Sequence, residues 1–360
     1  MREFKCQSCG AGIHYEPGTD QLKCPFCGKE NPIPKGEEEV GEQNLQEELA
    51  RAGEEGAEVG EVLVVPCEAC GAKTTFPPNV TADKCAFCGS PLVTGKSLSQ
   101  KKVQPHGILP FLVDSQKANQ SFARWIGSRW FAPNDLKRHS KNPSNLKGVY
   151  TPYWTFDGQT DSPYTGERGD DYWTTEAVSV VRNGRQCLEN RQVKHTRWSP
   201  ASGRVEHFFD DVLVPASNNL PRKYMEALEP WDLSQVVPYE ESYLSGFRVE
   251  SYTLPLAEGR GLAREKMERE IRRLVERDIG GDHQRVFQID TTYSQETFKH
   301  LLMPIWIDSY RYGEKVYRFL VNARTGEVQG ERPWSVVKIA FAILAAVALL
   351  FLLLTVVGEK

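Results

Sequence analysis

The chain of 360 residues lacks an excess of positive charge, a familiar catalytic motif and an apolar N-terminal segment. Lys and Arg total 44 against 48 Asp and Glu, and the formal charge of −4 is unlike that of a basic nucleic-acid-binding protein. The 7 histidines form no H-E-x-x-H pair, and the sequence has no G-x-S-x-G motif and no phosphate-binding loop. The start, MREFKCQSCG, predicts no secretory signal. These absences argue against a motor enzyme, a hydrolase of those motif classes and an exported protein.

Cysteine is concentrated in one pattern that occurs twice. Residues 6–28 read CQSCGAGIHYEPGTDQLKCPFCG, and residues 67–89 read CEACGAKTTFPPNVTADKCAFCG. The two copies are offset by 61 residues without a gap, and 10 of the 23 positions are identical. Each copy holds two C-x-x-C pairs separated by 14 residues. Eight of the nine cysteines belong to these pairs, so the sequence predicts two copies of one small metal-binding module.

The spacing is typical of a zinc ribbon. Two cysteines separated by two residues can direct both sulfurs at one ion, and the glycine after each pair relieves the tight turn. A gap of 14 is one residue short of the usual window of about 15–20, which a tighter hairpin can accommodate. Iron and disulfides are the alternatives, and we favour zinc because no export signal accompanies the cysteines. The expected ligands are Cys6, Cys9, Cys24 and Cys27 for one Zn²⁺, and Cys67, Cys70, Cys85 and Cys88 for a second.

Both predicted zinc ions are structural. Four cysteine ligands leave no open coordination position for water or a substrate. A ribbon this short has too small a core to fold alone, so the free energy of metal binding becomes folding free energy.

The C-terminal region contains the longest apolar run. Residues 339–357 read IAFAILAAVALLFLLLTVV, with Thr355 as the only polar side chain. At 1.5 Å per residue this run nearly crosses a hydrocarbon core of about 30 Å. Trp334 and Lys338 occupy positions typical of interface anchors. The sequence therefore predicts a tail-anchored, single-pass protein of the cell membrane. Its bulk is expected in the cytoplasm and a very short C-terminal tail outside.

The composition between the cysteine repeats differs from the rest. Residues 35–61 contain ten glutamates, two basic residues and no aromatic, which predicts a flexible, solvated linker. The predicted fold class is α+β. Its expected segments are ribbon 1 at 1–34, the acidic linker at 35–61, ribbon 2 at 62–98, a mainly antiparallel α+β domain at 105–332 and a transmembrane helix at 336–357.

Within the α+β domain, Asp114 or Ser115 is expected to cap a helix, and 262–279 form the clearest helical pattern. Glycine turns at Asn183-Gly184 and Ser202-Gly203 predict an antiparallel meander of short strands. A possible duplication relates the segment 148–156 to 300–308, at an offset of 152.

Several motifs give the chain a likeness to a known family. They are the paired CxxCG motifs, GVYTPYWTFDG at 148–158, YTGERG at 164–169, YLSGF at 243–247 and NARTGEVQGERPWS at 322–335. The chain resembles bacterial TFIIB-type zinc ribbon-containing membrane proteins, often labelled primosomal protein N′ (replication factor Y) superfamily II helicase. The chain has no helicase core, so the helicase activity is not expected. The resemblance implies a membrane-scaffold role, with the lipid bilayer and flotillin-like or phage-shock-type envelope proteins as partners.

Two functional hypotheses follow. The first is a non-catalytic, tail-anchored scaffold or adaptor that presents two zinc ribbons in the cytosol to protein partners. The alternative is a membrane-tethered nucleic-acid-binding protein. Residues 1–34 carry four basic and four acidic side chains, and residues 62–98 carry three and two, which lacks the basic footprint expected for phosphate recognition. An enzyme whose site is assembled from distant residues of the 105–332 domain is left open, although no motif supports it.

Overall fold

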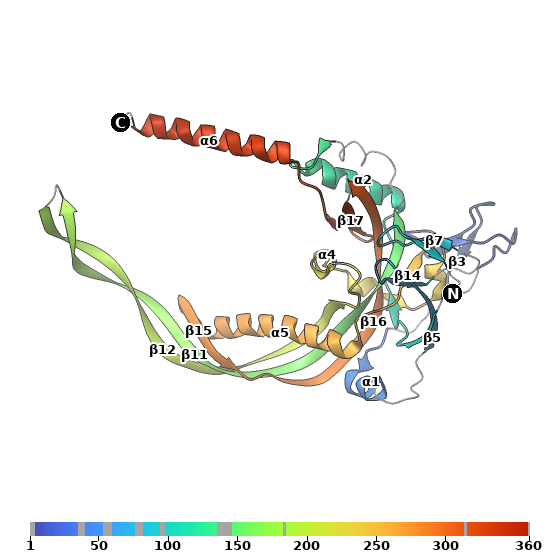
Figure 1. Ribbon diagram of the computed structural model, residues 1–360. Helices are drawn as coiled ribbons and strands as arrows, with labels where there is room; N and C mark the ends of the chain where they lie inside the picture. The colour runs from blue at the N-terminus through green and yellow to red at the C-terminus, as the bar shows by residue number, and fades with distance from the viewer. Residues whose placement is uncertain are drawn as a thin grey trace.

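The computed structural model describes residues 4–34, 40–52, 60–75, 82–93, 98–134, 146–182, 185–312 and 315–358. It is a mixed, sheet-rich α+β fold organised on one large, strongly curved sheet (Figure 1). The central strands are β11 (Lys147–Arg182) and β16 (Thr292–Tyr312), which pair antiparallel from Lys147↔Ile307 to Asp161↔Thr292. Around them lie β10 (Gly107–Ile108), β12 (Arg185–Pro215), β13 (Val237–Pro238), β14 (Arg248–Glu250), β15 (His283–Ile289), β17 (Lys315–Asn322) and β18 (Val328–Gly330).

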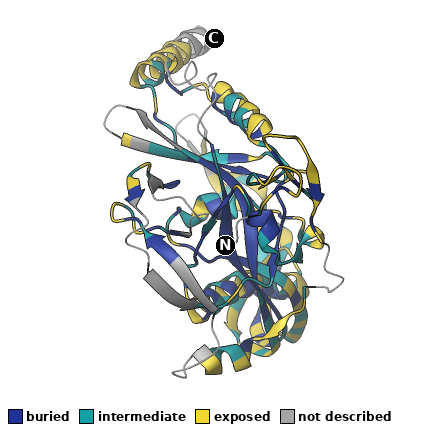
Figure 2. Ribbon diagram, turned by 90° about the vertical axis from the view of Figure 1, so that its right-hand side faces the viewer, coloured by how far each residue is buried: buried dark blue, intermediate teal, exposed yellow. Residues whose placement is uncertain are grey.

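The pairing is mainly antiparallel, with parallel contacts between β10 and β16 and between β11 and β14. Buried residues gather where these strands cross the body, and exposed residues lie mostly at the periphery (Figure 2). The largest fully buried side chains include Tyr150, Tyr153 and Trp154, all on β11. The segments 148–156 and 300–308, predicted as an internal repeat, pair with each other, since Tyr150 faces Pro304 and Pro152 faces Leu302.

Of the predicted meander, the antiparallel pairing on either side of 183–184 is confirmed, whereas the turn at Ser202-Gly203 is wrong. β11 and β12 are continuous and pair all the way to Arg182↔Arg185, forming a long two-stranded arm that projects from the body (Figure 1). The turn residues at 183–184 lie outside the described residues. Gly203, expected in a turn, lies inside β12 opposite Tyr164. A Cβ on Gly203 would lie 2.7 Å from the Tyr164 hydroxyl oxygen, so the glycine makes room for a side chain within the sheet.

Two helices were predicted well. α2 (Ser115–Ser128) begins where Asp114 accepts a hydrogen bond from the Lys117 amide, and it buries Ala118, Phe122 and Ile126. α5 (Leu256–Ile279) starts earlier than the predicted 262 and lies on the concave side of the arm (Figure 1). The shorter helices are α4 (Arg222–Glu226), η2 (Leu233–Gln235) and η3 (Glu241–Leu244).

The N-terminal region contains the two ribbons. Ribbon 1 consists of β1 (His14–Tyr15), β2 (Gln21–Lys23) and β3 (Glu30–Pro32), which form their own three-stranded sheet. Ribbon 2 contains β5 (Gly60–Pro66), β6 (Lys73–Thr75), β7 (Ala82–Lys84), β8 (Pro91–Val93) and β9 (Leu98–Lys102). In ribbon 2, β5 and β6 join the large sheet, whereas β7 and β8 form a separate pair.

Part of the predicted flexible linker is ordered. β4 (Gln43–Asn44) pairs with β16, and α1 (Leu45–Ala52) follows it. The Asn44 side chain accepts hydrogen bonds from the amides of Gln46 and Glu47, which caps α1. Leu45 is 1% exposed. The prediction of a flexible spacer is therefore wrong for these residues, because strand pairing and one buried apolar side chain attach them to the sheet, although most of their side chains are exposed. Residues 35–39 and 53–59 lie outside the described residues.

The C-terminal helix α6 (Val336–Gly358) forms where the apolar run predicts a helix. Within the described part of the chain, no helix meets the length and apolarity needed to cross a membrane. On this finding the predicted transmembrane helix at 336–357 does not hold. The tail-anchored, single-pass location in the cell membrane, with a cytoplasmic bulk, does not hold either.

The residues expected to anchor that helix at an interface have contacts within the protein. Lys338 Nζ donates hydrogen bonds to the Ala132 carbonyl at 2.8 Å and to Asn134 Oδ1 at 2.7 Å. The ring centroids of Trp334 and Phe131 lie 6.1 Å apart. The Arg332 guanidinium lies over the Trp334 ring, 4.3 Å from its centroid. These contacts attach the start of α6 to the end of the α2 region.

Candidate metal centres

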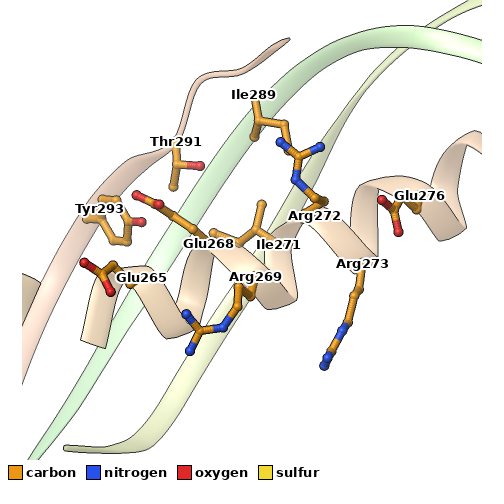
Figure 3. A pocket seen from close by; sticks show the side chains of 10 residues that line it. All are labelled: Glu265, Glu268, Arg269, Ile271, Arg272, Arg273, Glu276, Ile289, Thr291 and Tyr293. Atoms are coloured by element: carbon orange, nitrogen blue, oxygen red, sulfur yellow. The ribbon is translucent and has the colours of Figure 1, made fainter. Parts of the chain in front are cut away.

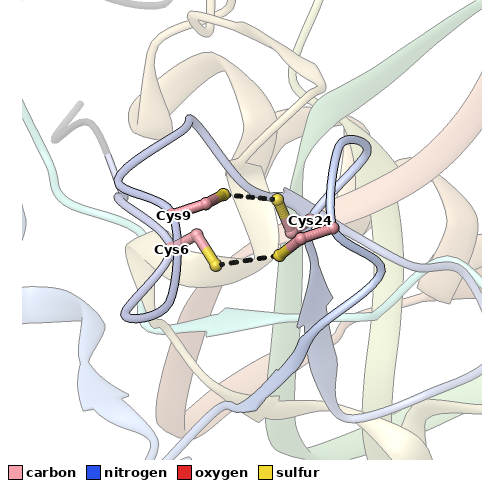
Figure 4. Close-up of side chains that lie close together, drawn as sticks. Cys6, Cys9 and Cys24 are labelled. Atoms are coloured by element: carbon pink, nitrogen blue, oxygen red, sulfur yellow. Dashed lines mark hydrogen bonds between the residues drawn. The ribbon is translucent and has the colours of Figure 1, made fainter.

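Ribbon 1 brings its four predicted ligands together in one cluster (Figure 4). The Sγ atoms of Cys6 and Cys27 lie 3.6 Å apart. Those of Cys9 and Cys24 lie 3.5 Å apart. Each C-x-x-C-G turn, here called a knuckle, ends in a glycine, and both Gly10 and Gly28 have a positive φ of 72°. The glycine amide donates to the carbonyl of the first cysteine, at 2.9 Å in the knuckle of Cys6 and at 3.0 Å in that of Cys24. The two knuckles are therefore matching tight turns that face one another.

Ribbon 2 repeats this geometry. The Sγ atoms of Cys67 and Cys88 lie 3.6 Å apart, and those of Cys70 and Cys85 lie 3.7 Å apart. Gly71 and Gly89 have φ values of 76° and 75°. The glycine amides donate to the cysteine carbonyls at 2.7 and 2.9 Å. Each cluster draws all of its ligands from its own repeat.

The donor sets fit a tetrahedral metal ion. Four thiolates at about 2.3 Å from an ion have sulfur atoms about 3.8 Å apart, close to the spacing in both clusters. The sulfurs are far beyond the about 2.0 Å of a disulfide, and all eight cysteines are free. Within each group, all four sulfurs lie within 4.8 Å of one another. Four soft thiolate ligands suit zinc or iron and complete the coordination of either.

The thiols of one cluster differ in acidity. Backbone hydrogen bonds from Cys27 and Phe26 lower the pKa of Cys24 to about 6. A backbone hydrogen bond from Ala11 favours the Cys9 thiolate, but the neighbouring Cys24 and Cys27 outweigh it and raise the pKa of Cys9 to about 12. Because a negatively charged thiolate opposes the ionisation of neighbouring thiols, a cation is needed to keep all four cysteines ionised at neutral pH.

Ribbon 1 is attached to the body through its first hairpin. The Tyr15 amide donates to the Ser245 carbonyl at 3.0 Å, and the Tyr15 hydroxyl donates to the buried Phe111 carbonyl at 3.0 Å. The Tyr15 ring packs edge-on against Tyr243, with the ring centroids 5.1 Å apart. Burial raises the pKa of this tyrosine, so it remains a neutral donor. The hairpin is therefore held by backbone, hydroxyl and ring contacts together.

Ribbon 2 is attached by a strand. β6 pairs antiparallel with β14, so that Thr74 faces Glu250. The ladder is extended by the Ser251 amide, which donates to the Lys73 carbonyl at 3.0 Å. Arg248 Nη1 donates to the Lys84 carbonyl at 2.8 Å. Both ribbons thus dock on the segment that runs from η3 through β14, which corrects the expectation of modules separated by a loose spacer.

A third group of candidate ligands was not predicted from the sequence. Carboxylate oxygens of Glu42, Asp157 and Asp210 lie within 4.8 Å of one another. Burial raises the pKa of Asp157 to about 6, and Lys299 Nζ lies 2.8 Å from an oxygen of the adjacent Asp211. These residues come from the linker, β11 and β12, and a β-bulge after Phe156 brings two of them together. The lysine already neutralises part of this charge, so we assign no metal to the group.

A cavity lies between α5 and the strand that follows β15 (Figure 3). Its volume is about 730 Å³. The lining carries both signs of charge, with Glu265 and Glu268 near Tyr293, and Arg272 near Ile289 (Figure 3). Further lining residues are Arg269, Ile271, Arg273, Glu276 and Thr291. The glutamates and arginines form a charged face of α5, and the helix buries Ala263, Met267 and Val275 among its apolar residues.

Comparison with known proteins gives one distant relative. The chain is 24% identical over 345 residues to the uncharacterized protein YdjG of Bacillus subtilis (strain 168). The similarity covers 94% of this chain and 92% of YdjG, so it extends across the ribbons, the arm and the body. No family model matches the chain. No solved structure matches it either.

Proposed function

We propose that this protein is a non-catalytic scaffold for protein–protein contacts, in which each four-cysteine cluster holds one structural Zn²⁺. The closed donor sets support a structural role, because four thiolates leave no position for a substrate. Zinc is favoured over iron because it is the usual structural ion for paired C-x-x-C knuckles. In this proposal the zinc ions fasten both ribbons to the body, and the body presents surfaces to partners.

The observation that supports a scaffold most directly is the exposed arm. β15 pairs with β11 only as far as Gly169↔His283, and beyond that point the described arm consists of two strands. Trp173 is 61% exposed there and Leu188 is 75% exposed. An isolated two-stranded hairpin is marginal in water, and exposed large apolar side chains mark interaction sites. A protein partner that covers the arm would bury the side chains of Trp173 and Leu188.

A photo-crosslinking amino acid at position 173 of the full-length chain tests this function in the source cells. The expected result is a discrete adduct with another protein, identified by mass spectrometry. The resemblance makes flotillin-like and phage-shock-type proteins the first candidates to test. With the purified partner, Trp173→Ala should weaken binding, whereas Trp130→Ala should not, although Trp130 is equally exposed at 67%.

Three results would count against the scaffold. The first is the absence of any adduct from the arm or the ribbons. The second is a catalytic turnover that maps to the cavity on α5. The third is tight binding of DNA or RNA at low salt, which would favour the nucleic-acid alternative.

A further inference from the structure

The two ribbons present the same aromatic residue in opposite surroundings. Phe26 lies between Cys24 and Cys27, and Phe87 holds the equivalent place in the second repeat, 61 residues later. Phe87 is 0% exposed and belongs to a buried cluster of the body. Phe26 is 82% exposed. One copy of the knuckle is therefore docked through its phenylalanine, and the other is not docked within this chain.

The two knuckles are locally equivalent. The Cys24 amide donates to the Lys29 carbonyl at 3.0 Å, and the Cys85 amide donates to the Ser90 carbonyl at 2.7 Å. The glycines that close the turns have φ values of 72° and 75°. The exposure of Phe26 is thus not the result of a different backbone. It arises because ribbon 1 attaches through Tyr15 on its first hairpin, and the knuckle plays no part in the bonds that this tyrosine makes.

We propose that Phe26 and the knuckle around it form a docking surface for a different protein. This partner offers a preformed apolar socket like the one that holds Phe87 in this chain. The inference rests on the proposed scaffold function and identifies one of its binding surfaces. A second copy of this chain does not supply the socket, because its own Phe87 already fills it.

The intramolecular socket indicates the chemistry of the partner. The buried cluster that contains Phe87 is mainly aliphatic, with Leu109, Val149 and Leu301 among its members, and it also contains Tyr153 and Trp231. An arginine binds the backbone directly before this knuckle, since Arg248 Nη1 donates to the Lys84 carbonyl at 2.8 Å.

The cysteines on the exposed knuckle add a second requirement. Cys9 and Cys27 are both exposed. In a four-thiolate zinc site their sulfurs carry part of a net charge of about −2. The expected partner surface is therefore an apolar pocket bordered by arginine or backbone N–H donors.

The first test places a photo-crosslinking amino acid at position 26 of the full-length, zinc-loaded chain in its source cells, in parallel with the probe at position 173. A discrete adduct with a different protein from position 26 is expected. Adducts from position 173 without any from position 26 overturn this docking surface and leave the scaffold function standing. The absence of adducts from both positions overturns both. An adduct of position 26 with a second copy of the chain overturns the docking proposal.

The second test measures the affinity of the purified crosslinked partner for variants of the full chain. Phe26→Ala is expected to raise the Kd about 10- to 100-fold, which corresponds to losing the burial of one phenylalanine. Phe26→Leu should recover most of that loss because it restores an apolar side chain. Phe208→Ala serves as the matched control and should change the Kd less than about 2-fold, because it removes a phenylalanine that is 51% exposed on β12 opposite Gln159, outside the two-stranded part of the arm.

Zinc content and thermal stability are measured for each of these variants, so that a folding defect is recognised. An unchanged Kd for Phe26→Ala with intact zinc content overturns the docking surface. An equal loss for Phe26→Ala and Phe208→Ala also overturns it.

Discussion

The different roles of the two equivalent phenylalanines lead to a matched pair of stability predictions. Phe87→Ala removes a fully buried ring, and such truncations typically cost about 3–5 kcal/mol because a cavity remains. Phe26→Ala removes a ring that is 82% exposed, and surface substitutions usually change stability by less than about 0.5 kcal/mol. The free energy of unfolding of the full, zinc-loaded chain should therefore fall in the first variant and stay nearly unchanged in the second.

The same perturbation has a local signature. The Ser251 amide donates to the Lys73 carbonyl at 3.0 Å, and this bond belongs to the ladder that joins ribbon 2 to β14. If Phe87 holds ribbon 2 in place, its removal lowers the free energy of opening this ladder. A loss of about 3 kcal/mol corresponds to an exchange rate about 100-fold faster for the Ser251 amide. Urea unfolding gives the global value, and hydrogen exchange with mass spectrometry gives the local one.

Two outcomes would refute this reasoning. Equal destabilisation by Phe26→Ala and Phe87→Ala would mean that the knuckle phenylalanine acts within its own ribbon and not through docking. Unchanged exchange at the ladder in Phe87→Ala would mean that strand pairing alone holds ribbon 2.

Three further predictions address the metal sites, a buried acid and the ribbon 1 contact. Metal analysis of the purified chain should find two zinc ions, and a single ion or iron would contradict the assignment. A strong chelator should release both ions and unfold the ribbons, which would appear as increased proteolysis at 4–34 and 60–93. Glu250 is 1% exposed, and its burial raises its pKa to about 7, so the fold favours the neutral acid. The free energy of unfolding should therefore fall by about 3 kcal/mol as pH rises from about 4.5 through about 7. Urea titrations at several pH values measure this fall, and Glu250→Gln should remove it. The same fall in the variant would exclude Glu250 as its source. Tyr15→Phe deletes the bond to the Phe111 carbonyl and should cost about 1 kcal/mol in the same titrations, with no change in zinc content.

Local patterns were sufficient for several elements. The Asp114 cap and the helix that follows it lie where the sequence indicated. Each depends on residues within a few positions of one another, so no distant contact is needed to form it.

Elements that depend on distant contacts were misjudged. Ser202-Gly203 reads as a turn, yet Gly203 continues β12 because the Tyr164 side chain packs against it from the paired strand. The acidic composition around Leu45 indicates a solvated linker, yet this leucine is buried and β4 pairs with a strand more than 250 residues later. Neither contact leaves a signal in the local sequence.

The paired knuckles show most clearly what each level of structure decides. The sequence by itself determined the two four-cysteine groups, because the C-x-x-C-G spacing makes each knuckle a self-contained turn whose geometry depends on adjacent residues. It could not decide which phenylalanine is buried, since Phe26 and Phe87 have the same local context. The tertiary structure decided this, because ribbon 1 docks through Tyr15 near Ser245, whereas ribbon 2 docks through its strand and its knuckle. The physical reason is that burial depends on which surface of a module faces the body, and that surface is chosen by residues distant in sequence.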